Sequence, residues 1–206
     1  MREVQINISS PGVMLVHNER LANTMDPIAK DMATITSKRK KTDDDRDDLA
    51  RHEFYGGLYT YGDRLLGDSE NVPSSWEIYN KTGIPLWNVF VCLKNGAKLN
   101  RLGTTVDRAV LPFGEDMLPL HHDGPNNPFE MWTQGFYDQR SVKVATSKVT
   151  RTRPKYVNWS TTARFLVDTE LLNIDDFKMI AINAGRTAGL GTYRPRFGRF
   201  EVEVIA

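Results

Sequence analysis

Apolar and polar residues alternate in several stretches of the chain, and this alternation is typical of half-buried strands. The clearest case is the N-terminus, where Val4, Ile6 and Ile8 repeat at a spacing of two. The pattern predicts strands at 1–8, 106–113, 141–153, 159–167 and from Phe200 onward. We expect Ser9–Gly12 to break the first strand before a short apolar run at 13–16, and Pro154 to join the third strand to the fourth.

Apolar residues three or four positions apart predict amphipathic helices in three other places. These helices cover 23–36, 85–99 and a stretch from Asn173 or Asp175 to about Gly185. The charged run 37–48 is either a surface insertion or a helix start capped by Thr42 or Asp43. Polar, glycine-rich and proline-rich stretches at 37–83 and 114–135 predict two large insertions, with one short strand near 58–61.

The order of these elements favours one domain of the α+β class over residues 1–206, a ferredoxin-like sheet with helices and large loop insertions. Its 206 residues can bury a sizeable core. The single cysteine, Cys92, lies in an apolar run and reads as a small buried side chain. No signal peptide and no apolar run of membrane-spanning length are present, so we expect a cytoplasmic protein without a membrane partner.

Charge is distributed unevenly, although the net charge is only +1. From residue 139 onward there are twelve Lys and Arg against six Asp and Glu, so the first two thirds of the chain are acidic. Such asymmetry indicates an anionic partner for the basic part, or a basic face that is merely solvated.

The strongest chemical signal is the segment from Gly185 to Arg199, called the Gly/Arg segment below. Glycine allows close backbone approach and positive φ, guanidinium groups donate to phosphate oxygens, and aromatic rings stack on unpaired bases. The segment therefore predicts a grip on single-stranded RNA or DNA. The expected backbone-binding residues are Arg186, Tyr193, Arg194, Arg196 and Arg199, with Gly189, Gly191 and Gly198 approaching phosphates.

This segment is not a mononucleotide or dinucleotide loop. A Walker A string is missing, and a Rossmann fingerprint needs a strand before its glycines and a helix after them. Here the glycines follow the predicted helix and precede the last strand. We expect no cofactor.

A helix, a glycine-rich loop and a final strand resemble the C-terminal signature of the RAMP superfamily, the RRM-like RNA-binding proteins of CRISPR effector complexes. The matching residues are Ala188-Gly189-Leu190-Gly191 and Phe197-Gly198-Arg199-Phe200-Glu201-Val202. The chain is also similar to uncharacterised phage and prophage proteins with this ending. The resemblance covers about the last thirty residues. It implies an RRM-like domain whose loop lines the nucleic-acid path, with Arg196 and Arg199 nearest the backbone.

A second basic element, 148–156, carries Arg151, Arg153 and Lys155. Arg151 and Arg153 point to one face of an extended chain, so they can extend the grip into a track. The alternative is an edge strand whose charges prevent aggregation.

Catalysis has less support in the sequence. The His121-His122-Asp123 run has metal-ligand types, but no second cluster completes a site, so we expect no metal. Two further readings stay open beside a non-catalytic nucleic-acid-binding protein that can form an oligomer or filament. One is a phage structural or interaction protein that self-assembles or binds an acidic partner. The other is a metal-independent ribonuclease using His17, which the RAMP resemblance implies.

Overall fold

The computed structural model describes residues 1–61, 81–144 and 147–206, which divide into two compact units. The first unit is Met1–Met14, Gly83–Asp123 and Tyr156–Ala206, and the second is Leu15–Thr82 and Gly124–Lys155. Most of the two predicted insertions belongs to the second unit. The part of them at 62–80 lies outside the described residues.

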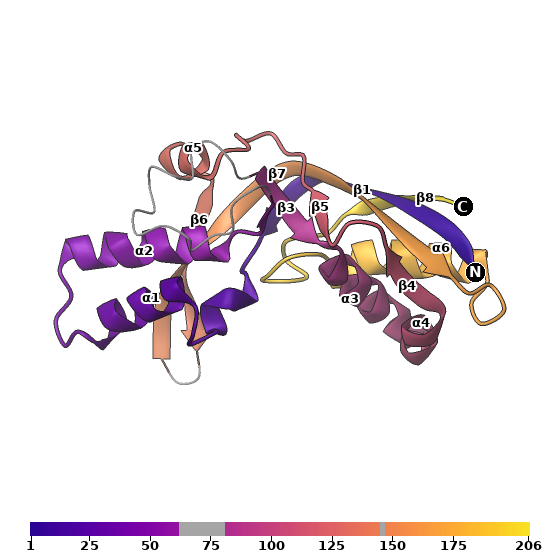
Figure 1. The fold of residues 1–206 in the computed structure, drawn as a ribbon, viewed down its shortest axis with the longest axis horizontal. Helices are drawn as coiled ribbons and strands as arrows, with labels where there is room; N and C mark the ends of the chain where they lie inside the picture. Colours follow the sequence, from indigo (N-terminus) through magenta and orange to yellow (C-terminus); the bar gives the residue numbers. More distant parts are fainter. Residues whose placement is uncertain (62–80, 145–146) are drawn as a thin grey trace. The chain divides into compact units, whose positions relative to one another are not determined.

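The first unit is built on an antiparallel sheet with strand order β4-β7-β1-β8. These strands are β4 (Val110–Phe113), β7 (Ser147–Val167), β1 (Arg2–Leu15) and β8 (Glu201–Ile205). In the β1–β8 pair Ile6 lies opposite Val204, which brings the two ends of the chain side by side (Figure 1). Strand β4 pairs with the end of β7, where Val110 lies opposite Val167.

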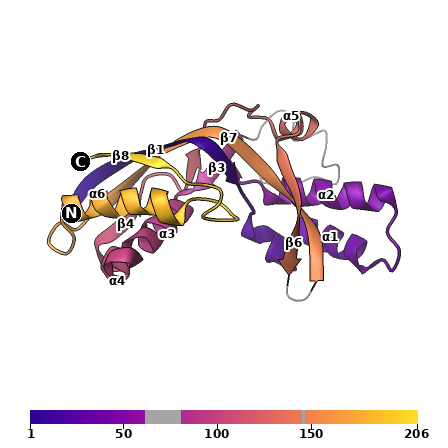
Figure 2. The ribbon, with the colours of Figure 1, turned by 180° about the vertical axis from the view of Figure 1, so that it is seen from behind.

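Helices α3 (Leu86–Ala97), α4 (Gly103–Ala109) and α6 (Ile174–Asn183) lie along one face of this sheet, as Figures 1 and 2 show. Side chains of β1 alternate, so Val4, Ile6 and Ile8 are buried toward the helices. The opposite face is polar, and there Asn7 bonds Glu203 and Thr162. An antiparallel sheet with helices on one face confirms the α+β class.

Two short strands complete the edge of the first unit. The end of β3 (Lys81–Pro85) pairs with β5 (Met117–Pro119), with Ile84 opposite Leu118. In the second unit, β2 (Thr60–Tyr61) pairs with the start of β3. Three turns of 3-10 or π-helix link other elements: η1 (Glu19–Ala22), η2 (Lys98–Asn100) and η3 (Ala184–Ala188).

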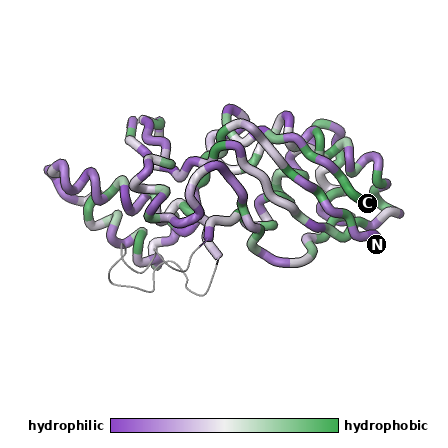
Figure 3. Tube along the Cα trace, turned by 90° about the horizontal axis from the view of Figure 1, so that it is seen from above, coloured by the Kyte–Doolittle hydropathy of each residue, from purple (hydrophilic) through white to green (hydrophobic). Residues whose placement is uncertain are grey.

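The second unit packs three helices and a long hairpin around aromatic rings. Its helices are α1 (Pro27–Ser37), α2 (Asp43–Gly57) and α5 (Pro128–Thr133), and its hairpin pairs β6 (Tyr137–Val144) with the first part of β7. The buried ring of Phe54 contacts the half-buried rings of Trp132 and Tyr137, which also stack on each other. Figure 3 shows that the connection between α1 and α2 is strongly hydrophilic.

Several sequence predictions are confirmed. The helices predicted at 23–36, 85–99 and from Asn173 correspond to α1, α3 and α6, and Asn173 caps α6 through Asp176 N. The charged run is a helix start: Thr42 and Asp45 form a capping box that satisfies two backbone N–H groups at the beginning of α2. The final strand is β8.

Four strand predictions were wrong. The stretch 141–153 is not one strand, because β6 ends at Val144 and the chain turns back to pair as β7 from Ser147. Strand β1 does not break at Ser9–Gly12, because Ser10 Oγ accepts the Gly12 N–H at 3.1 Å and the strand bends without ending. Strand β7 runs 21 residues straight through Pro154, whose carbonyl oxygen accepts from Val16 N at 3.1 Å. The first half of the strand predicted at 106–113 is the end of helix α4.

None of the helices in the described residues combines the length and the apolar character that a membrane span requires.

Candidate nucleic-acid interface

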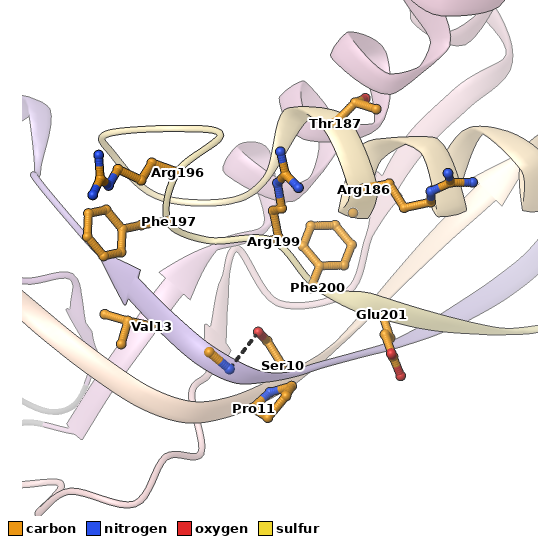
Figure 4. Close-up of a pocket in the computed structure, with 12 residues that line it drawn as sticks. Ser10, Pro11, Val13, Arg186, Thr187, Arg196, Phe197, Arg199, Phe200 and Glu201 are labelled. Carbon is orange, nitrogen blue, oxygen red and sulfur yellow. Dashed lines mark hydrogen bonds between the residues drawn. The ribbon is translucent and has the colours of Figure 1, made fainter.

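The Gly/Arg segment lines an open groove in the first unit, together with the bend of β1 (Figure 4). Helix α6 ends at Asn183 and continues as the π turn η3, after which the chain turns at Gly189 and returns to β8. The groove, called the arginine groove below, has a volume of about 640 Å³. Its lining residues are Ser10, Pro11, Gly12, Val13, Gly185, Arg186, Thr187, Arg196, Phe197, Arg199, Phe200 and Glu201.

Three exposed arginines, Arg186, Arg196 and Arg199, contribute the charge of this groove. Arg199 Nε donates to the Pro195 carbonyl oxygen at 3.0 Å, which fixes the direction of its guanidinium group. Within the described residues, none of the three forms an ion pair, and Glu201 is the single acidic residue in the lining. The groove therefore presents a net positive charge whose donors are open to an anionic ligand.

Aromatic and aliphatic side chains form the apolar part of the lining. In Figure 4, Phe197 and Phe200 lie between the arginines and the β1 residues Pro11 and Val13. Phe200 is 7% exposed and packs edge to face on Trp159, with ring centroids 6.1 Å apart. An apolar floor beneath guanidinium groups suits a ligand that has both flat rings and phosphates.

The glycines have a different role from the one that the sequence suggested. Gly189 N donates to Ala184 O at 2.8 Å and Gly198 N donates to Val13 O at 2.9 Å, so these amides are already used inside the protein. A Cβ on Gly198 would lie 1.8 Å from Leu190 O. These two glycines let the backbone cross itself closely, and the crossing in turn places the arginines.

The middle of the Gly/Arg segment lines a second, smaller hollow of about 410 Å³. Its lining residues are Asn95, Ala188, Gly191, Thr192, Tyr193, Arg194 and Pro195. Arg194 donates to Gly189 O at 3.4 Å, so it lies in this hollow and not in the arginine groove. The predicted residues Tyr193, Arg194 and Gly191 thus gather here.

The second basic element takes part in the packing of the second unit. Arg151 forms an ion pair with Glu53, a carboxylate that is 2% exposed and that also accepts from Thr152 N at 2.7 Å. Arg153 is buried, and Lys155 N donates to Phe136 O. Because the arginine groove belongs to the first unit, a track that joins it to these residues stays a prediction.

His17 and His122 lie in different units, and each has a lowered pKa. His17 lies in the second unit, where burial and the charges of Arg153 and Arg151 lower its pKa. Burial lowers the pKa of His122 to about 4, and its ring packs edge to face on Tyr156. Among the residues that the structure describes, no cluster of His, Cys, Asp or Glu is suited to hold a metal ion.

Cys92 lies beneath the loop, with Sγ 3.2 Å from Gly189 O. Burial raises the pKa of its thiol to about 12, so at neutral pH it is a protonated donor that supports the turn at Gly189.

The β1 side of the groove, formed by Ser10, Pro11, Gly12 and Val13, was missed from the sequence. The signal was present, because a Ser-Pro-Gly run inside an alternating strand pattern marks a bend or bulge as readily as an end. A comparison of the chain with protein-family models and with curated proteins finds no match. Function therefore has to be inferred from the groove itself.

Proposed function

We propose that this protein is a non-catalytic single-stranded nucleic-acid-binding protein that holds the phosphate backbone in the arginine groove. The observation that carries this proposal is the placement of Arg186, Arg196 and Arg199 around an apolar floor, without ion pairs among the described residues. Phosphates neutralise guanidinium groups, while unpaired bases stack on aromatic rings. A duplex keeps its bases stacked inside, so it cannot use the floor.

The order of elements in the first unit supports an RRM-like, ferredoxin-like reading of the fold. With the short elements β3, η2, α4, β5 and η3 set aside, the first unit runs β1, α3, β4, β7, α6, β8 along the chain. This is the strand-helix-strand-strand-helix-strand order of that class. In many RRM domains aromatic residues on the open sheet face stack on bases. Here the centre of that face carries Asn7, Thr162 and Glu203, so we assign binding to the groove at the end of α6. We propose a relationship to the RAMP superfamily on the same grounds.

Binding of fluorescently labelled single-stranded RNA and DNA, followed by anisotropy over a range of salt, tests the proposal. We expect affinity to fall as salt rises, since counterions are released from each neutralised phosphate. Replacing Arg186, Arg196 and Arg199 together by Ala should weaken binding. It should also reduce the slope of log affinity against log salt by about 2, because each lost phosphate contact on a single strand reduces this slope by roughly 0.7.

A matched variant with Arg2, Arg108 and Lys178 replaced by Ala removes the same charge from the first unit outside both hollows. This variant should bind nearly as well as the wild type. Equal losses in the two triple variants would show that net charge, and not the groove, determines binding. Absence of binding by the wild type to either nucleic acid would refute the proposal.

A second candidate function, self-assembly or capture of a protein partner, is favoured by strand β4 at the end of the sheet. Leu111 and Phe113 of β4 are 45% and 38% exposed, and an exposed apolar edge strand invites pairing. Size-exclusion chromatography with and without an oligonucleotide separates the two functions. An assembly that forms without the oligonucleotide and that Phe113→Lys dissociates would favour this second function.

A further inference from the structure

The Gly/Arg segment lines two hollows with different parts of its length. Its two ends, residues 185–187 and residues 196, 197 and 199, line the arginine groove, whereas residues 188 and 191–195 line the second hollow. The arginine groove has three arginines and two phenylalanines, and the second hollow has Arg194 and Tyr193. A ligand with repeated units of phosphate and flat ring could place one unit in each.

The aromatic rings of the two hollows are neighbours. Tyr193 lines the second hollow and Phe197 lines the arginine groove, and their ring centroids are 6.0 Å apart with planes inclined at 45°. The tilt and the spacing exceed those of two stacked bases, which are about 3.4 Å apart. The pair therefore has the shape of a wedge with one ring toward each hollow.

The backbone holds Tyr193 in an unfavourable conformation to keep its ring there. Its φ is +60°, in the left-handed region that favours glycine, and the residue is 42% exposed. A bulky residue in this region costs on the order of 1 kcal/mol. Exposed aromatic surface held against conformational preference is typical of a binding position and not of core packing.

We infer that the Tyr193–Phe197 pair separates two neighbouring bases of the bound strand, one in the arginine groove and the other against Tyr193 in the second hollow. This inference rests on the proposed function and makes it more specific. The ligand must be a flexible strand whose adjacent bases can unstack, so a pre-stacked or paired strand binds poorly. Arg194 and Asn95 then supply donors for the nucleotide in the second hollow.

Fluorescence of 2-aminopurine placed within a short oligonucleotide tests the inference, since this base brightens when it loses its stacking partner. With wild-type protein we expect a several-fold rise for a 2-aminopurine next to another purine. Tyr193→Ala should abolish the rise and weaken binding roughly tenfold, the typical cost of one lost base–aromatic stack. Tyr193→Phe, which keeps the ring, should behave like the wild type.

Trp87→Ala serves as the control, because Trp87 is an aromatic residue of the first unit that is 61% exposed and lies outside both hollows. It should change neither affinity nor fluorescence. Tight, salt-dependent binding by the wild type without any fluorescence rise would overturn the wedge and leave the proposed function standing. Absence of binding would remove both.

Discussion

At the scale of single residues, the most constrained position of the Gly/Arg segment is Gly198. Its φ is +78°, and its Cα lies so close to the opposite strand of the loop that an added Cβ would meet Leu190 O at 1.8 Å. The same crossing is fastened by hydrogen bonds from Leu190 N to Gly198 O and from Gly198 N to Val13 O. One glycine thus joins the loop to itself and to β1.

Replacement of Gly198 by Ala should therefore cost more than a change of conformational preference alone. We expect a loss of at least about 3 kcal/mol in unfolding free energy and a weaker grip on oligonucleotides, because the backbone must separate. Gly135→Ala is the matched control, with a φ of +77° and nothing within 4 Å of the new Cβ. It should cost only about 1 kcal/mol. Urea unfolding of both variants measures the difference, and equal losses would contradict it.

At the scale of elements, helix α2 and the β6–β7 hairpin are joined by one buried carboxylate. Glu53 of α2 accepts from Arg151 Nη1 and from Thr152 N, both in β7. The charge of Glu53 also interacts favourably with that of Arg153. A buried carboxylate with both oxygens occupied links the two elements and sets their register.

Loss of this carboxylate should destabilise the second unit strongly. Glu53→Gln keeps an acceptor for Thr152 N but removes the buried charge that pairs with Arg151, at a cost of about 3 to 5 kcal/mol. Arg46→Ala removes an exposed ion pair with Asp43 and should cost less than about 1 kcal/mol. Thermal denaturation followed by circular dichroism compares the variants. A Glu53→Gln protein as stable as the wild type would show that the ion pair is dispensable.

At the scale of the whole molecule, stability should depend on pH through His122. Its ordinary pKa of 6.5 is lowered by burial to about 4 in the folded protein, partly opposed by the charge of Asp123. His122 thus takes up a proton below about pH 6.5 in the unfolded chain, but only below about pH 4 in the folded protein. The contribution of His122 to stability is complete above pH 6.5 and is lost as pH falls toward 4.

We expect this loss to be on the order of 1 to 2 kcal/mol, after allowance for the partial exposure of the ring. Urea unfolding measured above pH 6.5 and again just above pH 4 gives the value. His122→Gln, which cannot titrate, should show a flatter dependence over the same window. If the unfolding free energies of the variant and the wild type depend on pH in parallel, a group other than His122 is responsible.

The sequence predicted the parts of the fold that local periodicity determines. Side-chain spacing predicted helices α1, α3 and α6 and the alternation of β1. Thr42 is a typical capping residue and indicated where α2 begins. The path of β7 did not follow from periodicity, because Pro154 is accommodated by a long-range hydrogen bond from Val16 N. Contacts between residues far apart in the chain override a local breaker.

The candidate site was also predicted only in part from the sequence. Its arginines and aromatic residues were recognisable by composition, since their types alone suit phosphates and bases. The use of the glycine amides was not recognisable, because Gly198 N finds its acceptor on Val13, in a distant part of the chain. The β1 side of the groove was likewise hidden in what looked like a strand break.

The pairing of β1 with β8 also determines when the sheet can form during synthesis of the chain. Asn7 forms a hydrogen bond with Glu203, 196 positions later, so one side of β1 stays unpaired until residues 201–205 have been synthesised. At ordinary translation rates this wait lasts roughly 10 to 40 s. During that time Val4, Ile6 and Ile8 form an incomplete apolar strand, and the groove has no second wall. We therefore expect a nascent chain to be prone to aggregation until residues 201–205 have been made.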